Sequence, residues 1–125
     1  MNLEDQVCSL ELAKKLKELS VKQKSYFSWV NDKDYSWQVW NPTFASEYET
    51  DSTTEWLAAF TVSELGEMLP PYFCTVDAER KYKWSCEKWS RGIIDAEVPT
   101  QYANTEADAR AKTLIYLIEN KLITL

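Results

Sequence analysis

The clearest periodic pattern of hydrophobic positions lies near the end of the chain, in residues 105–122. Its apolar side chains recur at helical spacing. They are Ala107, Ala111, Leu114, Ile115, Ile118 and Leu122. Thr105 followed by Asp108 is the pattern of a capping box at a helix start. We therefore predict a helix over 105–122, and we expect it to bury its apolar side against the sheet face that carries Trp29, Trp37 and Trp84.

Two further stretches have helical periodicity and a start signal. Residues 10–19 place Leu12, Leu16 and Leu19 on one face, and Ser9 before them is a suitable N-cap. Thr61 with Glu64 is a second capping box. It opens a short helix that must end before the two prolines at 70 and 71.

Residues 25–40 have the composition of a β-hairpin, with a turn cluster at 31–34. Pairing Trp29 with Trp37 and Phe27 with Val39 gives one apolar face. Tyr26 and Trp40 then lie on the other face and are expected to be exposed. The aromatic residues are interpreted as core, with a surface for stacking bases or sugars as the alternative.

A second hairpin is predicted over residues 72–89, where apolar and polar residues alternate. The favoured register pairs Val76 with Tyr82, Cys74 with Trp84 and Tyr72 with Cys86, which places all six side chains on one face. Ile94, Ala96 and Val98 alternate with acidic residues and predict a possible fifth strand that ends at Pro99. Residues 101–104 are interpreted as the connection to the last helix.

The predicted order of elements is α–ββ–α–ββ(β)–α, in a single domain over residues 1–125 with an acidic loop at about 43–55. Hairpins favour antiparallel pairing, and strands with one apolar face need a layer of helices. We therefore predict an α+β sandwich with a four- or five-stranded antiparallel sheet covered by helices.

Composition excludes several kinds of site. The chain has no histidine and three cysteines, Cys8, Cys74 and Cys86, which are expected to be free thiols. Catalytic sites that need histidine and histidine-containing zinc sites are therefore excluded. No metal or cofactor is expected. No apolar run reaches the length of a membrane span and no signal peptide opens the chain, so we expect a cytoplasmic protein without a membrane partner.

Charge is distributed unevenly within a formal net charge of −6. Residues 44–79 contain eight acidic residues and no Lys or Arg, whereas residues 80–92 contain five basic residues and one glutamate. A nucleic-acid-binding protein usually carries a basic surface, so direct nucleic-acid binding is disfavoured. The acidic stretch instead suits a basic protein partner.

Three segments resemble small uncharacterised proteins encoded by phages and prophages. They are residues 12–26, the block AFTVSELGEMLP at 59–70, and TEADARAKTLIYLIENKLI at 105–123. Some proteins of that kind are described as phage α/β sandwiches. The resemblance implies a phage origin, the host-cell cytoplasm and a sandwich fold, and it transfers no catalytic residue.

The sequence favours a non-catalytic protein-binding module over an enzyme, because no phosphate loop or other catalytic motif is present. The predicted contact residues are Trp40, Glu47, Tyr48, Glu49 and Asp51. Three alternatives remain open: an acidic decoy that mimics nucleic acid, a minor virion or assembly component, and a carboxylate-based enzyme. The partner's identity and the oligomeric state are left open by the sequence.

Overall fold

A computed structural model of the chain describes residues 2–31, 36–41, 55–77, 83–90, 93–94 and 98–124. The elements in these ranges are α1 (Leu3–Gln6), α2 (Leu10–Glu18), β1 (Ser28–Asn31), β2 (Gln38–Trp40), β3 (Glu55–Ala58), α4 (Val62–Met68), β4 (Phe73–Asp77), β5 (Trp84–Ser90), β6 (Ile93–Ile94), β7 (Gln101–Ala103) and α5 (Glu106–Glu119). The predicted α+β class and the antiparallel pairing of strands are confirmed.

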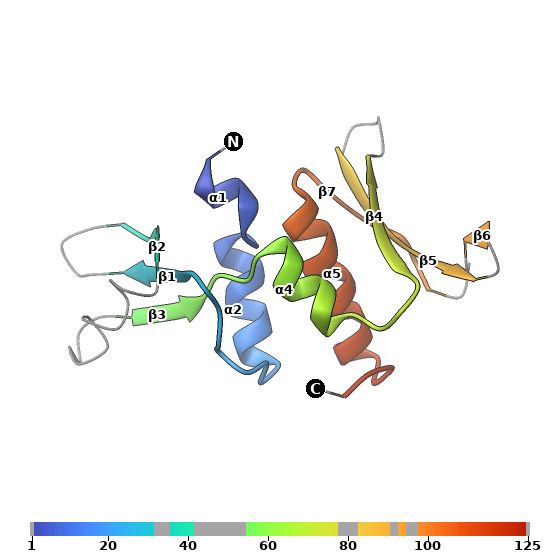
Figure 1. Cartoon of the computed structure of the whole chain (residues 1–125). Helices are drawn as coiled ribbons and strands as arrows, with labels where there is room; N and C mark the ends of the chain where they lie inside the picture. Colours follow the sequence, from blue (N-terminus) through green and yellow to red (C-terminus); the bar gives the residue numbers. More distant parts are fainter. Residues whose placement is uncertain are drawn as a thin grey trace.

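The described strands form two separate sheets, so the predicted single sheet of four or five strands is wrong. The first sheet has the order β2-β1-β3. In the second, β5 pairs with β4 along one edge and with β6 and β7 along the other. The helices lie between the two sheets (Figure 1). Residues 101–103, predicted as a connection, form β7. The predicted strand over 94–98 is replaced by the two-residue β6, and Ala96 lies outside the described residues.

Helix α5 is the central element, in contact with α1, α2 and α4 and with strands β4, β5 and β7. Its buried residues are Ala107, Ala109, Ala111, Thr113, Leu114, Ile115 and Leu117, which occupy more than one face. The predicted helix therefore exists, and Leu114 and Ile115 are buried as expected. Two details are wrong. Leu122 follows the end of the helix and is 54% exposed, and Trp29 and Trp37 belong to the sheet beside α2.

Helix α2 connects the first sheet to α5. Trp29 of β1 is buried, and its Nε1 donates a hydrogen bond to the carbonyl oxygen of Cys8 at 2.9 Å. The N–H of Ser9, the N-cap of α2, donates to Oδ1 of Asp108 at 2.6 Å. The hydroxyl of Ser9 does not cap its own helix. Burial raises the pKa of the Asp108 carboxyl group above its ordinary value, although the hydrogen bonds from Ser9 oppose that shift.

The two predicted capping boxes differ in the structure. At α4, Glu64 Oε1 accepts from the N–H of Thr61 at 3.0 Å, and the Thr61 hydroxyl accepts from the N–H of Glu64, so the box is complete. At α5, Thr105 accepts from the N–H of Asp108, but the Asp108 carboxylate bonds Ser9 instead of closing the box. Asp108 thus joins two helices where the sequence suggested only a local cap.

The first hairpin is confirmed, but its register differs by two residues. Trp29 pairs with Val39, and Val30 pairs with Gln38. A shift of two residues keeps every side chain on its predicted face, so hydrophobic alternation cannot distinguish the two registers. β1 also pairs with β3 on its other edge. Ser28, Trp29 and Val30 are all buried, on both faces of this central strand.

The second hairpin is also confirmed, but its register differs by three residues. Thr75 pairs with Cys86, and Asp77 pairs with Trp84. An odd shift reverses the faces of one strand relative to the other. Cys86 is buried, whereas Cys74 and Val76 are exposed on the opposite face of the sheet. The side chains of β4 that were predicted to be core are therefore on the surface.

Two residues on the helix-facing side of β4 account for this reversal: Phe73 packs against the core, and Thr75 is bonded by Arg110 of α5. Nη1 of Arg110 donates to the carbonyl oxygen of Val62 at 2.9 Å, and Nη2 donates to Oγ1 of Thr75 at 3.3 Å. The helix-facing side of β4 therefore carries a hydroxyl that accepts from a guanidinium. Gly66 lies against the same guanidinium, and a Cβ at that position would collide with Nη1 of Arg110. The glycine costs α4 helix propensity and makes room for Arg110.

Leu114→Ala should lower the free energy of unfolding by about 2–5 kcal/mol, because it removes a fully buried side chain from the centre of the core. Leu122→Ala is the matched control, and we expect it to change stability by less than about 0.5 kcal/mol. Urea denaturation followed by circular dichroism measures both. Equal effects of the two substitutions would contradict the central position of α5.

Gly66→Ala should destabilise the protein, although helix propensity alone predicts a gain of up to about 1 kcal/mol. The new methyl group would displace Arg110 from Val62 and Thr75. In an Arg110→Ala background the same substitution should be stabilising. A double-mutant cycle measures the coupling. Gly66→Ala acting equally in both backgrounds would contradict the proposed contact.

Candidate functional site

The contact site predicted from the sequence lies mostly outside the described residues. Glu47, Tyr48, Glu49 and Asp51 belong to the range 42–54, which the structure does not describe. Trp40 ends β2, is half-buried, and donates from Nε1 to Oε1 of Gln38 at 3.2 Å. The sequence predicted that both Trp40 and Tyr26 would be exposed. This is correct for Tyr26 but not for Trp40. The predicted site therefore stays a prediction.

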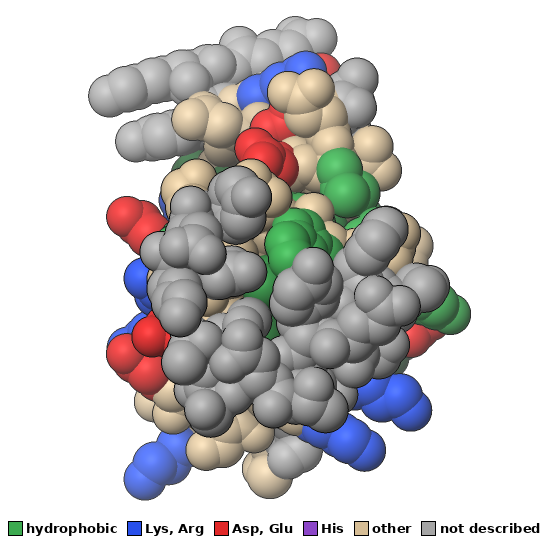
Figure 2. Space-filling model, turned by 90° about the vertical axis from the view of Figure 1, so that its left-hand side faces the viewer, with side chains coloured by type: hydrophobic (Ala, Val, Ile, Leu, Met, Phe, Trp, Pro, Cys, Tyr) green, Lys and Arg blue, Asp and Glu red, His purple; other side chains and the backbone are tan. Residues whose placement is uncertain are grey.

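Figure 2 shows the molecule from the side of the first sheet. Acidic and basic side chains are both visible, mainly toward the edges of this view, and hydrophobic side chains are visible nearer its centre. At this sheet Lys14 Nζ lies 5.4 Å from the centre of the Trp37 ring. Trp29 is buried with its ring nitrogen bonded, so the core interpretation of Trp29 is confirmed over the stacking alternative.

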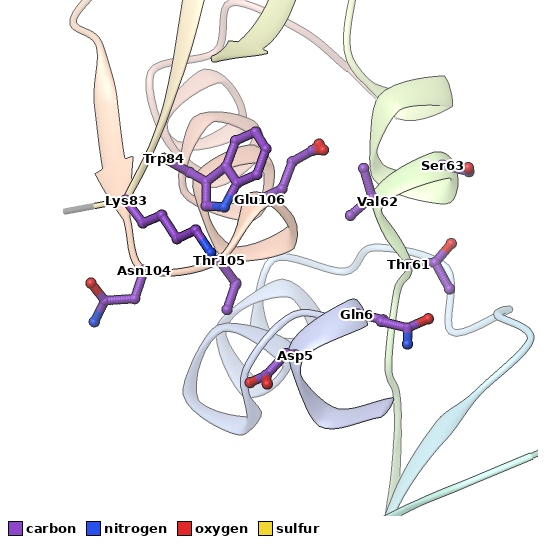
Figure 3. A pocket seen from close by; sticks show the side chains of 10 residues that line it. All are labelled: Asp5, Gln6, Thr61, Val62, Ser63, Lys83, Trp84, Asn104, Thr105 and Glu106. Atoms are coloured by element: carbon purple, nitrogen blue, oxygen red, sulfur yellow. The ribbon is translucent and has the colours of Figure 1, made fainter. Parts of the chain in front are cut away.

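A pocket of about 700 Å³ lies where α1, the start of α4, the start of α5 and the first residues of β5 meet. It is lined by Asp5, Gln6, Thr61, Val62, Ser63, Lys83, Trp84, Asn104, Thr105 and Glu106. In Figure 3, Trp84 and Glu106 lie across the pocket from the α4 residues, and Lys83 extends toward Thr105. The lining carries two carboxylates and one ammonium group, so it does not clearly favour either anionic or cationic ligands.

The side of the second sheet that faces away from the helices is a more distinctive surface. Side chains alternate along a strand, and the register places Cys74 and Val76 on the same face as Ser85, Glu87, Trp89 and Tyr102. Tyr72 comes just before β4, where its carbonyl oxygen accepts from the N–H of Trp89. We call these seven residues the outer face. The opposite face carries Trp84, Cys86 and Ala103 toward α5. Figure 1 shows the helices on only one side of β4 and β5.

The outer face exposes large side chains that are usually buried or bound. Tyr72 is 74% exposed, Val76 is 40% exposed and Tyr102 is 38% exposed. Trp89 is half-buried beside them. Exposed apolar and aromatic side chains that gather on one surface mark interaction sites more often than single exposed residues do. The outer face is therefore the candidate functional site.

Tyr72 has an unfavourable backbone conformation. Its φ is 77°, in the left-handed region that normally selects glycine or asparagine. The residue follows Pro70 and Pro71, and its carbonyl oxygen accepts from the N–H of Trp89 at 2.9 Å. A bulky aromatic residue that keeps this strained conformation with its ring in solvent is an outlier that supports a functional role.

Glu87 is the one charged residue at the described positions of the outer face. Its Oε1 accepts from the Ser85 hydroxyl at 3.2 Å, and its Oε2 accepts from Trp89 Nε1 at 3.0 Å. Glu87 pairs with Cys74 across the ladder, and the carboxylate helps to raise the pKa of that thiol, after the larger effect of desolvation. The two hydrogen bonds fix the carboxylate in position.

The described residues include no cluster of three or more His, Cys, Asp or Glu side chains that could hold a metal ion. Among them there is also no helix of the length and hydrophobicity needed to cross a membrane. The three cysteines are free, as the sequence predicted.

Comparison of the chain with protein-family models, with curated proteins and with solved structures found no match. The resemblance to phage proteins therefore has no support outside the sequence segments on which it was based.

The register makes a direct prediction about thiol reactivity. Cys74 should react with iodoacetamide in the folded protein, whereas Cys8 and Cys86 are buried and should react only after unfolding. Burial raises the pKa of Cys8 to about 12, which slows its reaction further. Because the pKa of Cys74 is also raised, its rate should level off at a higher pH than the rate of an ordinary thiol.

Mass spectrometry should find one modified cysteine in the native protein and three in denaturant. Protection of Cys74 together with Cys86 in the native protein would support the register predicted from the sequence, in which both thiols are buried, and would remove the outer face as described.

Proposed function

We propose that this chain is a non-catalytic protein-binding module and that its outer face is the contact surface. The observation that carries the proposal is the exposure of Val76 and Tyr102 on one side of a sheet whose other side is packed against α5, with the exposed Tyr72 at the start of β4. Tyr and Trp are enriched at protein interfaces because they supply a large contact area at a low cost in conformational entropy.

The position of the surface supports a role in binding. The outer face lies on a regular sheet, where β5 is hydrogen-bonded on both edges. Its backbone is therefore held by the ladder and needs little reordering when a partner docks. The strained backbone of Tyr72 is consistent with a side chain retained for contact.

The acidic segment remains a second proposed contact region, through Trp40, Glu47, Tyr48, Glu49 and Asp51. Its charge would attract a basic partner at long range, whereas the outer face would supply apolar contact. On the sequence resemblance alone, we also propose a phage origin and a role in the cytoplasm of the bacterial host.

The test is affinity capture from bacterial lysate with matched variants. Tyr72→Ser and Tyr102→Ser each remove one exposed ring from the outer face. Tyr26→Ser is the control, because Tyr26 is 70% exposed and lies before β1, away from the second sheet. Exposed tyrosines contribute little to folding, so all three variants should melt close to the unmodified protein.

Quantitative mass spectrometry should find a protein that the unmodified chain and the Tyr26 variant capture and that both outer-face variants lose. Removal of one hot-spot aromatic residue should weaken binding at least about 30-fold. Capture that is indifferent to Tyr72 and Tyr102 would reject the outer face as the contact surface.

A further inference from the structure

We infer that the partner presents an arginine side chain to Glu87 from within an otherwise apolar or aromatic segment of protein. This inference rests on the proposed function, since it specifies what the outer face binds. It follows from the charge on that face, from the unused acceptor capacity of Glu87, and from the ring beside it.

Charge complementarity is the first step. Six of the seven outer-face positions are uncharged, and Glu87 lies among them on the central strand β5. A partner that covers Tyr72, Val76 and Tyr102 would also remove water from this carboxylate. A buried carboxylate without a positive partner is strongly unfavourable. A segment that covers this face must therefore bring a cation to Glu87.

The hydrogen bonds of Glu87 favour arginine over lysine. Oε1 already accepts from Ser85 and Oε2 already accepts from Trp89. Each carboxylate oxygen has two lone-pair sites, so each keeps one for a partner. Two parallel acceptors match the fork of a guanidinium group, which binds carboxylates through two hydrogen bonds. A lysine ammonium group would use this pair of acceptors less fully.

Trp89 adds an aromatic surface at the same place. Its Nε1 lies 3.0 Å from Glu87 Oε2, so the indole is adjacent to the carboxylate. A guanidinium that pairs with Glu87 can also stack on an indole, which favours arginine again. Trp89 thus has two roles: it orients the carboxylate and it offers a stacking partner.

The same charge argues against a second copy of this chain as the occupant. In a two-fold dimer formed through the outer face, each copy would contribute the same surface. Two Glu87 carboxylates would then enter one apolar interface without a cation, and like charges there repel. The partner is therefore a different protein with a basic residue at the centre of its contact segment.

Selection from a random twelve-residue peptide library on the immobilised chain tests this inference. We expect the selected peptides to contain arginine flanked by apolar or aromatic residues. The best of them is then synthesised twice, once with arginine and once with citrulline, which has nearly the same shape but no charge. On the unmodified chain, citrulline should weaken binding at least about tenfold, because a charged hydrogen bond is lost.

Glu87→Gln supplies the matched protein variant. It should reduce the difference between the arginine and citrulline peptides to less than about threefold, since the charge pair is already absent. Circular dichroism checks that this variant folds. If it does not, the exchange of arginine for citrulline on the unmodified chain decides by itself.

Cys74 reports where the peptide binds, because its thiol is exposed on the outer face beside Glu87. The arginine peptide should slow the alkylation of Cys74, while the buried Cys8 and Cys86 stay unreactive.

The outcomes separate the two proposals. Peptides that protect Cys74 but lack arginine, or that tolerate citrulline, would overturn the role of Glu87 and leave the proposed function intact. Failure of every selected peptide to protect Cys74 would overturn both. Sedimentation of the chain as a dimer with a protected Cys74 would show that a second copy occupies the face, which also overturns the inference.

Discussion

Burial of α5 on several sides is the constraint on which the rest of the fold depends. The helix contacts three other helices and three strands, and Ala107, Ala109 and Ala111 on its first turns let these neighbours approach closely. Two polar side chains extend from it in different directions. Asp108 reaches the start of α2, and Arg110 reaches Val62 and Thr75. These bonds tie α5 to α2 and, through Arg110, to α4 and β4 of the second sheet, so each neighbour is positioned relative to the same helix.

The sequence predicted those features that are set locally. The positions of the helices and of both hairpins followed from periodicity. The starts of α4 and α5 followed from the capping residues Thr61 and Thr105. Features set by distant contacts were missed. Asp108 was assigned to a local cap because its partner Ser9 lies 99 residues away. The division into two sheets was missed as well, because strands with one apolar face suit one layer of helices whether they form one sheet or two.

The reversed face of β4 shows how one distant contact changes the surface of the protein. Tyr72, Cys74 and Val76 form an apolar row, whereas Thr75 and Asp77 on the other face are polar and only Phe73 there is apolar, so alternation directed the first set to the core. Arg110 supplies donors to Thr75 and thereby stabilises a polar group on the helix-facing side. Gly66 leaves the space that this arginine needs. A glycine and an arginine on two helices thereby stabilise the observed register. Within β4, Phe73 packs against the core and is the apolar signal that the predicted register did not use.

The outer face departs from local preference in two respects, and both carry a cost that the fold alone does not require. Large side chains remain in water, and Tyr72 adopts a left-handed backbone conformation that disfavours aromatic residues. Sequences depart from local preference chiefly where a site needs a particular side chain. Glycine or asparagine at 72 would relieve the strain and reduce the exposed apolar area. The presence of tyrosine there, beside a carboxylate held by Ser85 and Trp89, is what a binding surface requires and a purely structural turn does not.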